Sequence, residues 1–341
     1  MNEPWMISNL VVVAMLVGAV GVARAIRRDR LWLEASRDLV RRRPVALVVI
    51  ALYLVVALVD SVRWVGGAAV GGDAVAAHEA RSPIDRLFAG SQEKSYSAPF
   101  AKVEFYGGAP LEHPGKHPLG TDVLGRDCLY LLLKGARVAL LIGGVTSLIA
   151  IPLALLFGVS AGFVGGKVDD AVFFVMSTLA SMPALLLVIA LVMALGRGTL
   201  QVCIALGVTS WVNFCRMSRG ETFKLREMEY VQAARALGVS EVRIVFRHIL
   251  PNLSHLIVIT FVLTFSGLVL SEAVLSFLGI GVQGSWGQMI DRARDELARE
   301  PAVWWNLTAA GIALLVLILA VNVVGDAIRD VLDPRTLREN Q

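Results

Sequence analysis

The chain has 341 residues, of which 56% are hydrophobic and 18% charged, and its mean hydropathy is +0.67. This apolar content exceeds that of soluble globular domains, so the sequence is that of an integral membrane protein. The net charge of +4 requires no nucleic-acid partner, because the basic flanks of membrane helices account for it. The three cysteines form no C-x-x-C pair and indicate neither a disulfide framework nor a metal site.

Apolar runs predict seven membrane spans in chain order. They cover residues 4–23, 44–59, 138–166, 171–196, 198–215, 249–271 and 301–325. A helix needs about 20 residues to cross the hydrocarbon core, so run 44–59 must continue through Asp60 to Val65. The runs lack the alternation typical of barrel strands. The predicted fold is therefore an all-α, polytopic transmembrane helical bundle.

The distribution of Lys and Arg predicts the topology. Segment 24–43 carries eight Arg against three acids and segment 216–248 carries seven Lys or Arg against four, so both are expected in the cytoplasm. Loop 272–300 has three Arg against five acids and is expected outside. Seven spans place the N-terminus outside and the C-terminus in the cytoplasm. Run 4–23 lacks a basic segment before it, which favours a span over a cleaved leader, the alternative reading.

Residues 31–43 predict an interfacial helix with Trp32, Ala35 and Leu39 on one face, or else a basic flank without a defined helix. The Gly-, Ala- and Pro-rich segment 63–116 is expected to be an external loop or small subdomain. The motif HPLGTDVLGRD (117–127) follows. We expect Asp122 to cap a helix that runs on through GAR (135–137), on the outer membrane face. A metal or hydrolase site is the weaker alternative.

The chain contains no visible energy source. AGFVGGKV (161–168) departs from a phosphate-binding loop at the first glycine and at the final hydroxyl residue, and it lies in a turn between two predicted spans. Ion-driven carriers hold titratable groups at mid-membrane, whereas the apolar runs here hold almost none: His255 lies near one start, and Glu272 begins the external end of the sixth span. Energy for transport should therefore come from a partner.

Segment 231–252, VQAARALGVSEVRIVFRHILPN, predicts two short helices. Val231, Ala234 and Leu237 recur on one face of the first helix. On the second helix, Val242, Val245, Phe246 and Ile249 follow helical spacing. Gly238 is placed to close the first helix in a left-handed conformation, Ser240 to cap the second, and Pro251 to end it. A helix–turn–helix projection and an interfacial amphipathic linker both fit these residues.

This segment resembles the EAA loop of bacterial ATP-binding cassette importer permeases. Gln232, Ala233, Ala234, Gly238, Leu250 and Pro251 match in register, with Gln and His248 as departures similar to those of the dipeptide/oligopeptide permease family. Five further blocks resemble that family in order, namely HPLGTDVLGRD, GAR, GGKVDD (165–170), LSFLGIGVQ (275–283) and GDAIRDVLDPR (325–335). The resemblance covers about two thirds of the chain.

The resemblance implies a type I importer permease core of about six spans, with run 4–23 as an extra N-terminal span, in a bacterial inner membrane. It implies no catalytic residue and no cofactor in this chain, with ATP and Mg bound by partner ATPases. The implied partners are a homologous second permease, two ATPase subunits, an extracytoplasmic solute-binding protein and membrane lipid, but no nucleic acid. The implied cargo is a di- or oligopeptide, with nickel or another small solute as the alternative. An autonomous ion-coupled carrier is a distant third.

Two sets of site residues follow from the resemblance. The ATPase-coupling set is Tyr230, Gln232, Ala233, Ala234, Arg235, Gly238, Arg243, Arg247, His248, Leu250 and Pro251. The external set is His117, Gly120, Asp122, Gly125, Arg126 and Asp127. Small Ala233 and Ala234 would let the ATPase approach closely, and Arg235, Arg243 or Arg247 could pair with its acidic groups.

The expected organisation has five parts. They are an extra span and basic flank (1–29), an elbow helix and first family span (30–66), an external region (67–134), the transmembrane core (135–325, with the coupling loop at 216–251) and a cytoplasmic tail (326–341). Relatives carry a longer insert between Gln283 and Trp286, so the shortened loop predicts an altered external gate or binding-protein contact.

Overall fold

The computed structural model describes residues 9, 39–64, 81–196 and 198–332. The predicted span 4–23 and most of the predicted interfacial helix 31–43 lie outside these residues. The chain divides into two compact units, residues 1–140 with 273–327 and residues 141–272 with 328–341. In the described part every regular element is a helix, and strand pairing is limited to three isolated bridges. The predicted all-α fold is confirmed.

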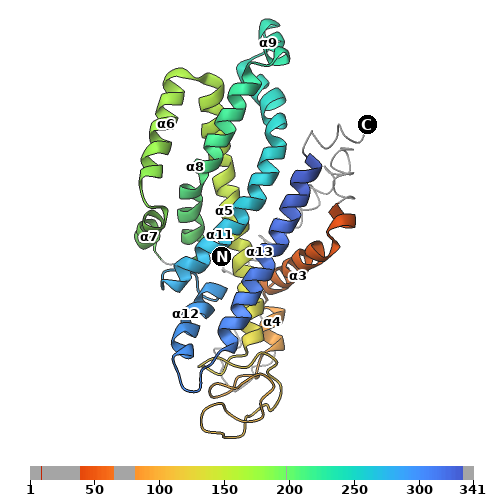
Figure 1. The fold of residues 1–341 in the computed structure, drawn as a ribbon, viewed down its shortest axis with the longest axis vertical. Helices are drawn as coiled ribbons and strands as arrows, with labels where there is room; N and C mark the ends of the chain where they lie inside the picture. Colours follow the sequence, from red (N-terminus) through yellow and green to blue (C-terminus); the bar gives the residue numbers. More distant parts are fainter. Residues whose placement is uncertain (1–8, 10–38, 65–80, 197, 333–341) are drawn as a thin grey trace. The chain divides into compact units, whose positions relative to one another are not determined.

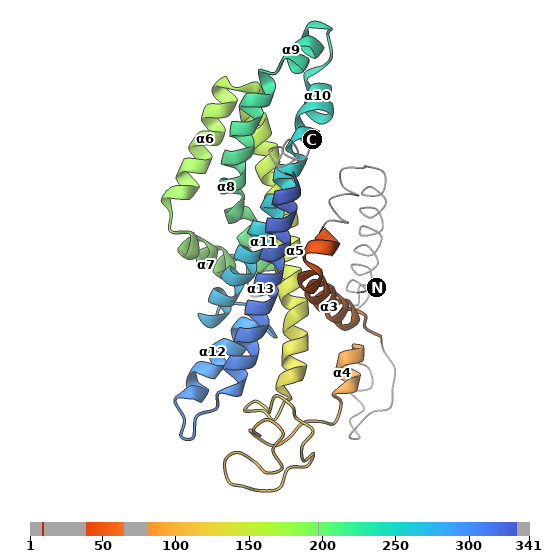
Figure 2. The same cartoon turned by 45° about the vertical axis from the view of Figure 1, so that its right-hand side comes forward.

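The first unit contains α3 (Pro44–Ser61), α4 (Pro83–Leu87), the start of α5 (Cys128–Val164), α12 (Trp286–Leu297) and most of α13 (Trp305–Leu332). A loop of irregular structure, residues 88–127, gathers at the end of α5 where that helix begins (Figure 2). Side chains of this loop pack on the start of α13: the Trp305 indole N–H donates to the Thr121 carbonyl at 2.9 Å. The same cluster buries Tyr96, Cys128 and Val303.

The second unit contains the rest of α5, then α6 (Gly166–Ser181), α7 (Ala184–Leu195), α8 (Thr199–Arg226), α9 (Glu229–Ala236) and α10 (Glu241–Ile244). A π-helical turn (Val245–Ile249) and a 3₁₀ turn (Leu250–Leu253) connect α10 to α11 (Ser254–Phe277). Both views show α9 at the end of α8, beyond the turn from α5 to α6 (Figure 1; Figure 2).

Most of the predicted spans are confirmed as long apolar helices. Five described helices can cross a membrane by length and composition, Pro44–Ser61, Cys128–Val164, Thr199–Arg226, Glu241–Phe277 and Trp305–Asp330. The predicted span 171–196 is not one straight helix, because α6 and α7 meet at a bend of 93°. Pro183 lacks an N–H and disfavours helical backbone at the preceding Met182, whose ψ is 139°. Helices α6 and α7 count as a sixth membrane span if the two together form one broken span.

Glycines on α5 allow close packing of α5 against α8. A Cβ at Gly158 would lie 2.7 Å from the Cys215 carbonyl oxygen, and one at Gly162 would lie 2.6 Å from the Arg219 carbonyl oxygen. The two glycines are four residues apart and therefore share a helix face. Small residues at this spacing let membrane helices touch backbone to backbone. The coupling loop thus rests on a tightly packed helix pair.

We expect Gly158→Ala and Gly162→Ala each to destabilise the fold by about 1–3 kcal/mol, because the added methyl overpacks a backbone contact. Gly220→Ala on α8 is the matched control, since a Cβ there meets no atom within 4 Å. That change should be neutral or stabilise the helix by up to about 1 kcal/mol. Unfolding by SDS in mixed micelles measures all three variants. Equal free energies for all three would contradict the close packing.

Candidate functional site

The loop between α8 and α11 closes its first helix at Gly238, which has a φ of +78°. The Gly238 N–H donates to the Arg235 carbonyl at 3.0 Å, and the Val239 N–H donates to the Ala234 carbonyl at 3.1 Å. These two bonds form the standard glycine closure of a helix C-terminus. A Cβ at this position would meet no atom within 4 Å, so backbone conformation and not space calls for glycine. The predicted left-handed closure is confirmed.

The inner side of the loop is a buried apolar cluster, which we call the loop core. It contains Val159, Phe163, Leu225, Val231, Ala234, Ile244, Ile249 and Leu253. Four of these side chains, Val231, Ile244, Ile249 and Leu253, are fully shielded from solvent. A flexible linker would leave these apolar side chains in contact with water. The loop is therefore a folded element that packs on the ends of α5 and α8.

The predicted apolar faces were partly wrong. Leu237, Val242 and Phe246 are 83%, 68% and 68% exposed, and we call these three the tip residues. Val231, Ala234 and Ile249 of the predicted faces are buried, and so is Ile244, which the prediction left out. The five-residue spacing of the two isoleucines matches the wider π-helical turn 245–249, whereas the prediction assumed regular α-helical spacing. Periodicity alone contains no signal for such a turn.

Pro251 does not end the second helix, contrary to the prediction. Helical backbone continues from Glu241 to Phe277 through the π-helical and 3₁₀ turns, and Pro251 lies in the first turn of the 3₁₀ segment. The changed hydrogen-bond spacing accommodates the residue that lacks an N–H. Ser240 occupies the predicted N-cap position, although its side chain makes no capping hydrogen bond. Helical backbone therefore connects the loop to α11 without a break.

The three arginines of the predicted coupling set have different environments. Arg235 forms two 3.1 Å hydrogen bonds with Glu241 and lies 5.5 Å from the Phe163 ring centre. It therefore joins the two helices of the loop, which differs from the predicted role of pairing with an ATPase. Arg243 and Arg247 are exposed, and neither has an ion-pair partner among the residues that the structure describes. These two remain available to an acidic partner.

The remaining predicted coupling residues divide between surface and support. Gln232 and Ala233 are exposed, as are Tyr230 and Pro251, whereas Ala234 belongs to the loop core. His248 and Leu250 are half-buried. Support comes from side-chain hydrogen bonds: Gln232 donates to the Arg226 carbonyl at 3.1 Å, and Asn252 donates to the His248 carbonyl at 2.6 Å. Of the two alanines that were predicted to let the ATPase approach closely, only Ala233 lies at the surface.

Nothing in the sequence pattern indicated an ion pair between α6 and α8, which we call the Asp169–Arg219 clamp. The Arg219 guanidinium on α8 binds both carboxylate oxygens of Asp169 on α6, with one contact at 2.6 Å. The Cζ atom of the Arg219 guanidinium also lies 4.9 Å from the centre of the Phe223 ring. Arg226 donates to the Gly162 carbonyl at 3.2 Å. Asp169 belongs to the GGKVDD block. One role of this block is therefore structural, since its aspartate holds the start of α6 against α8.

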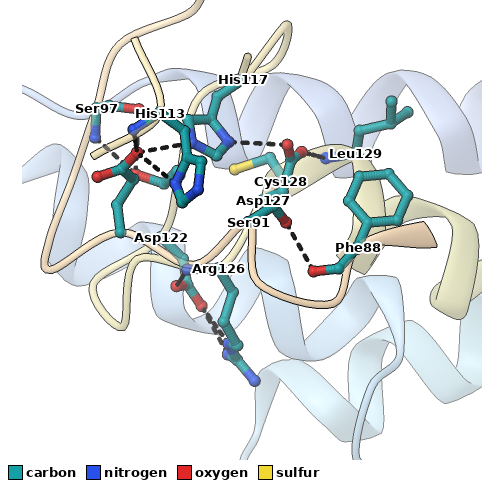
Figure 3. A network of polar contacts seen from close by, with 12 residues as sticks. Phe88, Ser91, Ser97, His113, His117, Asp122, Arg126, Asp127, Cys128 and Leu129 are labelled. Carbon is teal, nitrogen blue, oxygen red and sulfur yellow. Dashed lines mark hydrogen bonds and ion pairs between the residues drawn. The ribbon is translucent and has the colours of Figure 1, made fainter. Parts of the chain in front are cut away.

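The external motif folds as a tight turn, and the predicted helix from Asp122 is wrong. Asp122 Oδ1 accepts hydrogen bonds from the N–H groups of Leu124 and Arg126, both at 2.9 Å, which closes a local loop. Helix α5 begins only at Cys128, where Asp127 accepts from the Leu129 N–H at 2.7 Å. Asp122 and Arg126 do form an ion pair at 2.6 Å, outside any helix (Figure 3).

His117 lies at the centre of the motif and is 1% exposed. Its Nδ1 lies 2.9 Å from an Asp127 carboxylate oxygen and its Nε2 lies 3.2 Å from a Glu93 carboxylate oxygen. Figure 3 shows the ring directed at Asp127. Glu93 also accepts from the backbone N–H groups of Glu112 and His113, at 2.9 and 2.7 Å. The histidine thus joins three distant parts of the external loop.

Gly125 shows how tightly this loop is packed. Its φ is +70°, and a Cβ there would overlap the Glu93 carbonyl. At Gly120 a Cβ would lie 2.5 Å from the Ser97 carbonyl oxygen and 2.8 Å from the Trp305 indole nitrogen. Within the described residues no group of three His, Cys, Asp or Glu side chains is arranged to hold a metal ion. The motif residues act on one another, and their combined effect is a fixed external loop.

Comparison with known proteins gives the family. Residues 154–338 match the model of the binding-protein-dependent transport system inner membrane component family. The chain belongs to this family. The matched segment contains the whole coupling loop and the Asp169–Arg219 clamp. The chain is thus a multi-pass inner-membrane permease subunit of a binding-protein-dependent ABC transporter, and it is not itself an enzyme. It works with ATPase and binding-protein partners, and ATP binds to the ATPases.

Two curated relatives are permeases of peptide systems. The di/tripeptide transport system permease protein DppC of Pseudomonas aeruginosa is 37% identical over 220 residues, which are 64% of this chain and 72% of the relative. The oligopeptide transport system permease protein OppC of Bacillus subtilis is 36% identical over 222 residues, with the same shares. A solved structure of the inward-facing MetNI methionine ABC transporter aligns with a TM-score of 0.50 at 20% identity, over 60% of this chain and 98% of that chain. This likeness supports the importer permease fold.

Acid should loosen the external loop through Glu93. Burial raises the pKa of this carboxyl, but the two backbone N–H donors and His117 outweigh burial and lower the pKa overall. A lowered pKa in the folded state stabilises the fold above the unfolded-state pKa of about 4.3, and this contribution disappears as the pH falls through the folded value. The melting temperature of the purified permease in nanodiscs should therefore fall more steeply below about pH 4 than in Glu93→Gln.

Glu93→Gln should also lower the melting temperature at pH 7 by roughly 2–10 °C, since it leaves buried donors poorly matched. Glu112→Gln is the control, because that side chain is 55% exposed and its partner Lys94 lies at 3.7 Å. It should keep the wild-type pH profile. Identical acid slopes for wild type and Glu93→Gln would show that Glu93 does not hold the loop.

Proposed function

We propose that this chain is one of two homologous, distinct permease subunits of a peptide importer, with two ATPases docked on the cytoplasmic side and a solute-binding protein outside. The observation that carries the ATPase contact is the exposure of three large apolar side chains on a loop whose inner side is fully packed. Exposed apolar groups at the end of a folded projection are typical of a surface that a partner covers. The names of the relatives support di- or oligopeptides as cargo.

The proposed contact combines apolar and charged groups. Leu237 and Phe246 supply apolar area, and Arg243 and Arg247 supply two positive charges without ion-pair partners in the described part of the chain. A complementary ATPase surface is an apolar groove with acidic residues at its rim. Apolar anchors would then provide most of the affinity, and the charges would provide orientation and rate of association.

Continuity of the helix supports a mechanical role for the loop. The segment Glu241–Phe277 is one helical run of 37 residues that begins at the tip and continues through the apolar α11. The Arg235–Glu241 pair and the loop core tie the first loop helix to this run. A displacement of the tip by an ATPase would therefore move α11 and would not be absorbed by a flexible hinge. Coupling requires that ATP-driven closure favour one arrangement of the tip over another.

A serine scan of the tip tests this proposal. Phe246→Ser and Leu237→Ser should each weaken binding of the ATPase subunits to the permease pair in nanodiscs, for Phe246 by about 10- to 30-fold, because a buried anchor is lost. Met228→Ser is the matched control, since Met228 is 46% exposed and lies outside the tip residues. It should bind within about twofold of wild type, the range typical of surface changes.

Insertion and assembly with the second permease are measured in the same preparations and should be normal in all three variants. Full ATPase affinity in both tip variants would overturn the proposed contact. The interfacial-linker reading would then regain support, and it predicts that a lipid-borne quencher reaches a fluorophore at position 246. Transport of labelled peptides by the complete reconstituted complex tests the cargo separately.

A further inference from the structure

A polar pocket of about 260 Å³ lies in the first unit, between the external loop and α12. It is lined by Arg126, Leu131, Gln283, Gly284, Ser285, Gln288, Met289 and Arg292. The Arg126 and Arg292 side chains are 31% and 42% exposed, so a ligand can reach both guanidinium groups from solvent. The pocket includes Arg126 of the external motif and the shortened loop before Trp286, and no ligand has been assigned to it above.

The two arginines of the pocket differ in their ion pairing. Asp122 is the carboxylate closest to Arg292, and its two oxygens already accept four hydrogen bonds, two from backbone N–H groups and two from Arg126. The Arg292 guanidinium lies 3.9 Å from Asp122, at the outer limit of an ion pair. On the same helix, Asp295 pairs with Arg294, and Glu296 accepts from Asn306 and Tyr96. The Asp122 carboxylate is thus directed at Arg126, and Arg292 keeps only one distant carboxylate contact within the described residues.

Side-chain hydrogen bonds close the N-terminus of α12. Ser285 accepts from the Gln288 N–H at 3.2 Å, and the Gln288 side-chain oxygen accepts from the Gly284 N–H at 2.9 Å. This arrangement leaves the Gln288 amide nitrogen as a donor. The Gln283 carboxamide has no hydrogen-bond partner within the described residues. Leu131 and Met289 provide an apolar wall beside these donors.

We propose that this pocket binds a carboxylate joined to a short apolar group. A guanidinium group matches a planar carboxylate through two parallel hydrogen bonds, and side-chain amides add further donors. The exposed Arg292 guanidinium can pair with such a group, and Leu131 and Met289 fit the carbon atoms beside it. This inference rests on the proposed function, which supplies two sources of such a group: the free C-terminus of a peptide cargo, or an Asp or Glu side chain of the binding protein.

The complete reconstituted transporter tests the inference with Arg292→Gln. The first arm titrates the loaded cognate binding protein and records ATPase stimulation. The second arm supplies saturating binding protein preloaded with a tripeptide or with its C-terminal amide, and records uptake of each. Loss of a charge-assisted pair should raise half-saturation by the binding protein about three- to tenfold, or should lower the preference for the free acid by the same factor.

Arg294→Gln is the matched control, because it removes one positive charge from the same helix outside the pocket. Arg292→Lys should restore part of the effect, and Gln283→Leu should show a smaller loss of the same kind. A shift in the first arm identifies the binding protein as the source, and a shift in the second identifies the cargo. If Arg292→Gln equals Arg294→Gln in both arms, the pocket binds no carboxylate. If wild type transports no peptide, only the cargo proposal fails, since the first arm needs no peptide.

Discussion

Burial of Val231, Ile244 and Ile249 against Phe163 is the interaction on which the coupling loop depends. Val231 and Ile244 lie on the inner sides of α9 and α10, which have eight and four residues and would not be stable alone in water, and Ile249 lies in the π-helical turn that follows. Their burial fixes the angle between the helices, and Gly238 permits the chain reversal that the angle requires. Only with the inner side packed can the tip residues remain exposed in a defined arrangement. The proposed contact with an ATPase therefore depends on packing that the ATPase itself would not touch.

Close helix contacts extend this rigidity toward the membrane. Gly158 and Gly162 let α5 meet α8 at backbone distance, and the Asp169–Arg219 clamp fixes the turn to α6. In hydrocarbon, where apolar side chains gain little by association, such contacts and hydrogen bonds hold helices together. The external loop uses a different solution, since buried polar groups around His117 add to a small apolar cluster that contains Tyr96 and Trp305. Each unit is thus ordered by the chemistry that its own sequence offers.

The sequence predicted what depends on local chemistry and failed where tertiary contacts decide. Apolar runs located five of the long helices, and Gly238 indicated its own conformation. The bend before Pro183 was open to prediction, because proline restricts the residue before it. The prediction that Pro251 ends a helix was wrong, because the π-helical turn that accommodates this proline has no signal in the sequence. Asp122 closes a turn and does not cap a helix, because its carboxylate accepts hydrogen bonds from the backbone N–H groups of Leu124 and Arg126. The Arg235–Glu241 pair and the carboxylate pocket join residues that no periodicity connects.

The central claim is that the tip residues are a docking surface held out by a packed loop. Single cysteines at positions 237 and 246 test it most directly, because the native Cys128, Cys203 and Cys215 are all buried and give little background. Inside-out vesicles with the complete permease pair are labelled with a membrane-impermeant maleimide, with and without the ATPase subunits. The account predicts rapid labelling of the free permease and strong protection in the complex. Equal labelling in both, or protection without ATPase, would contradict it.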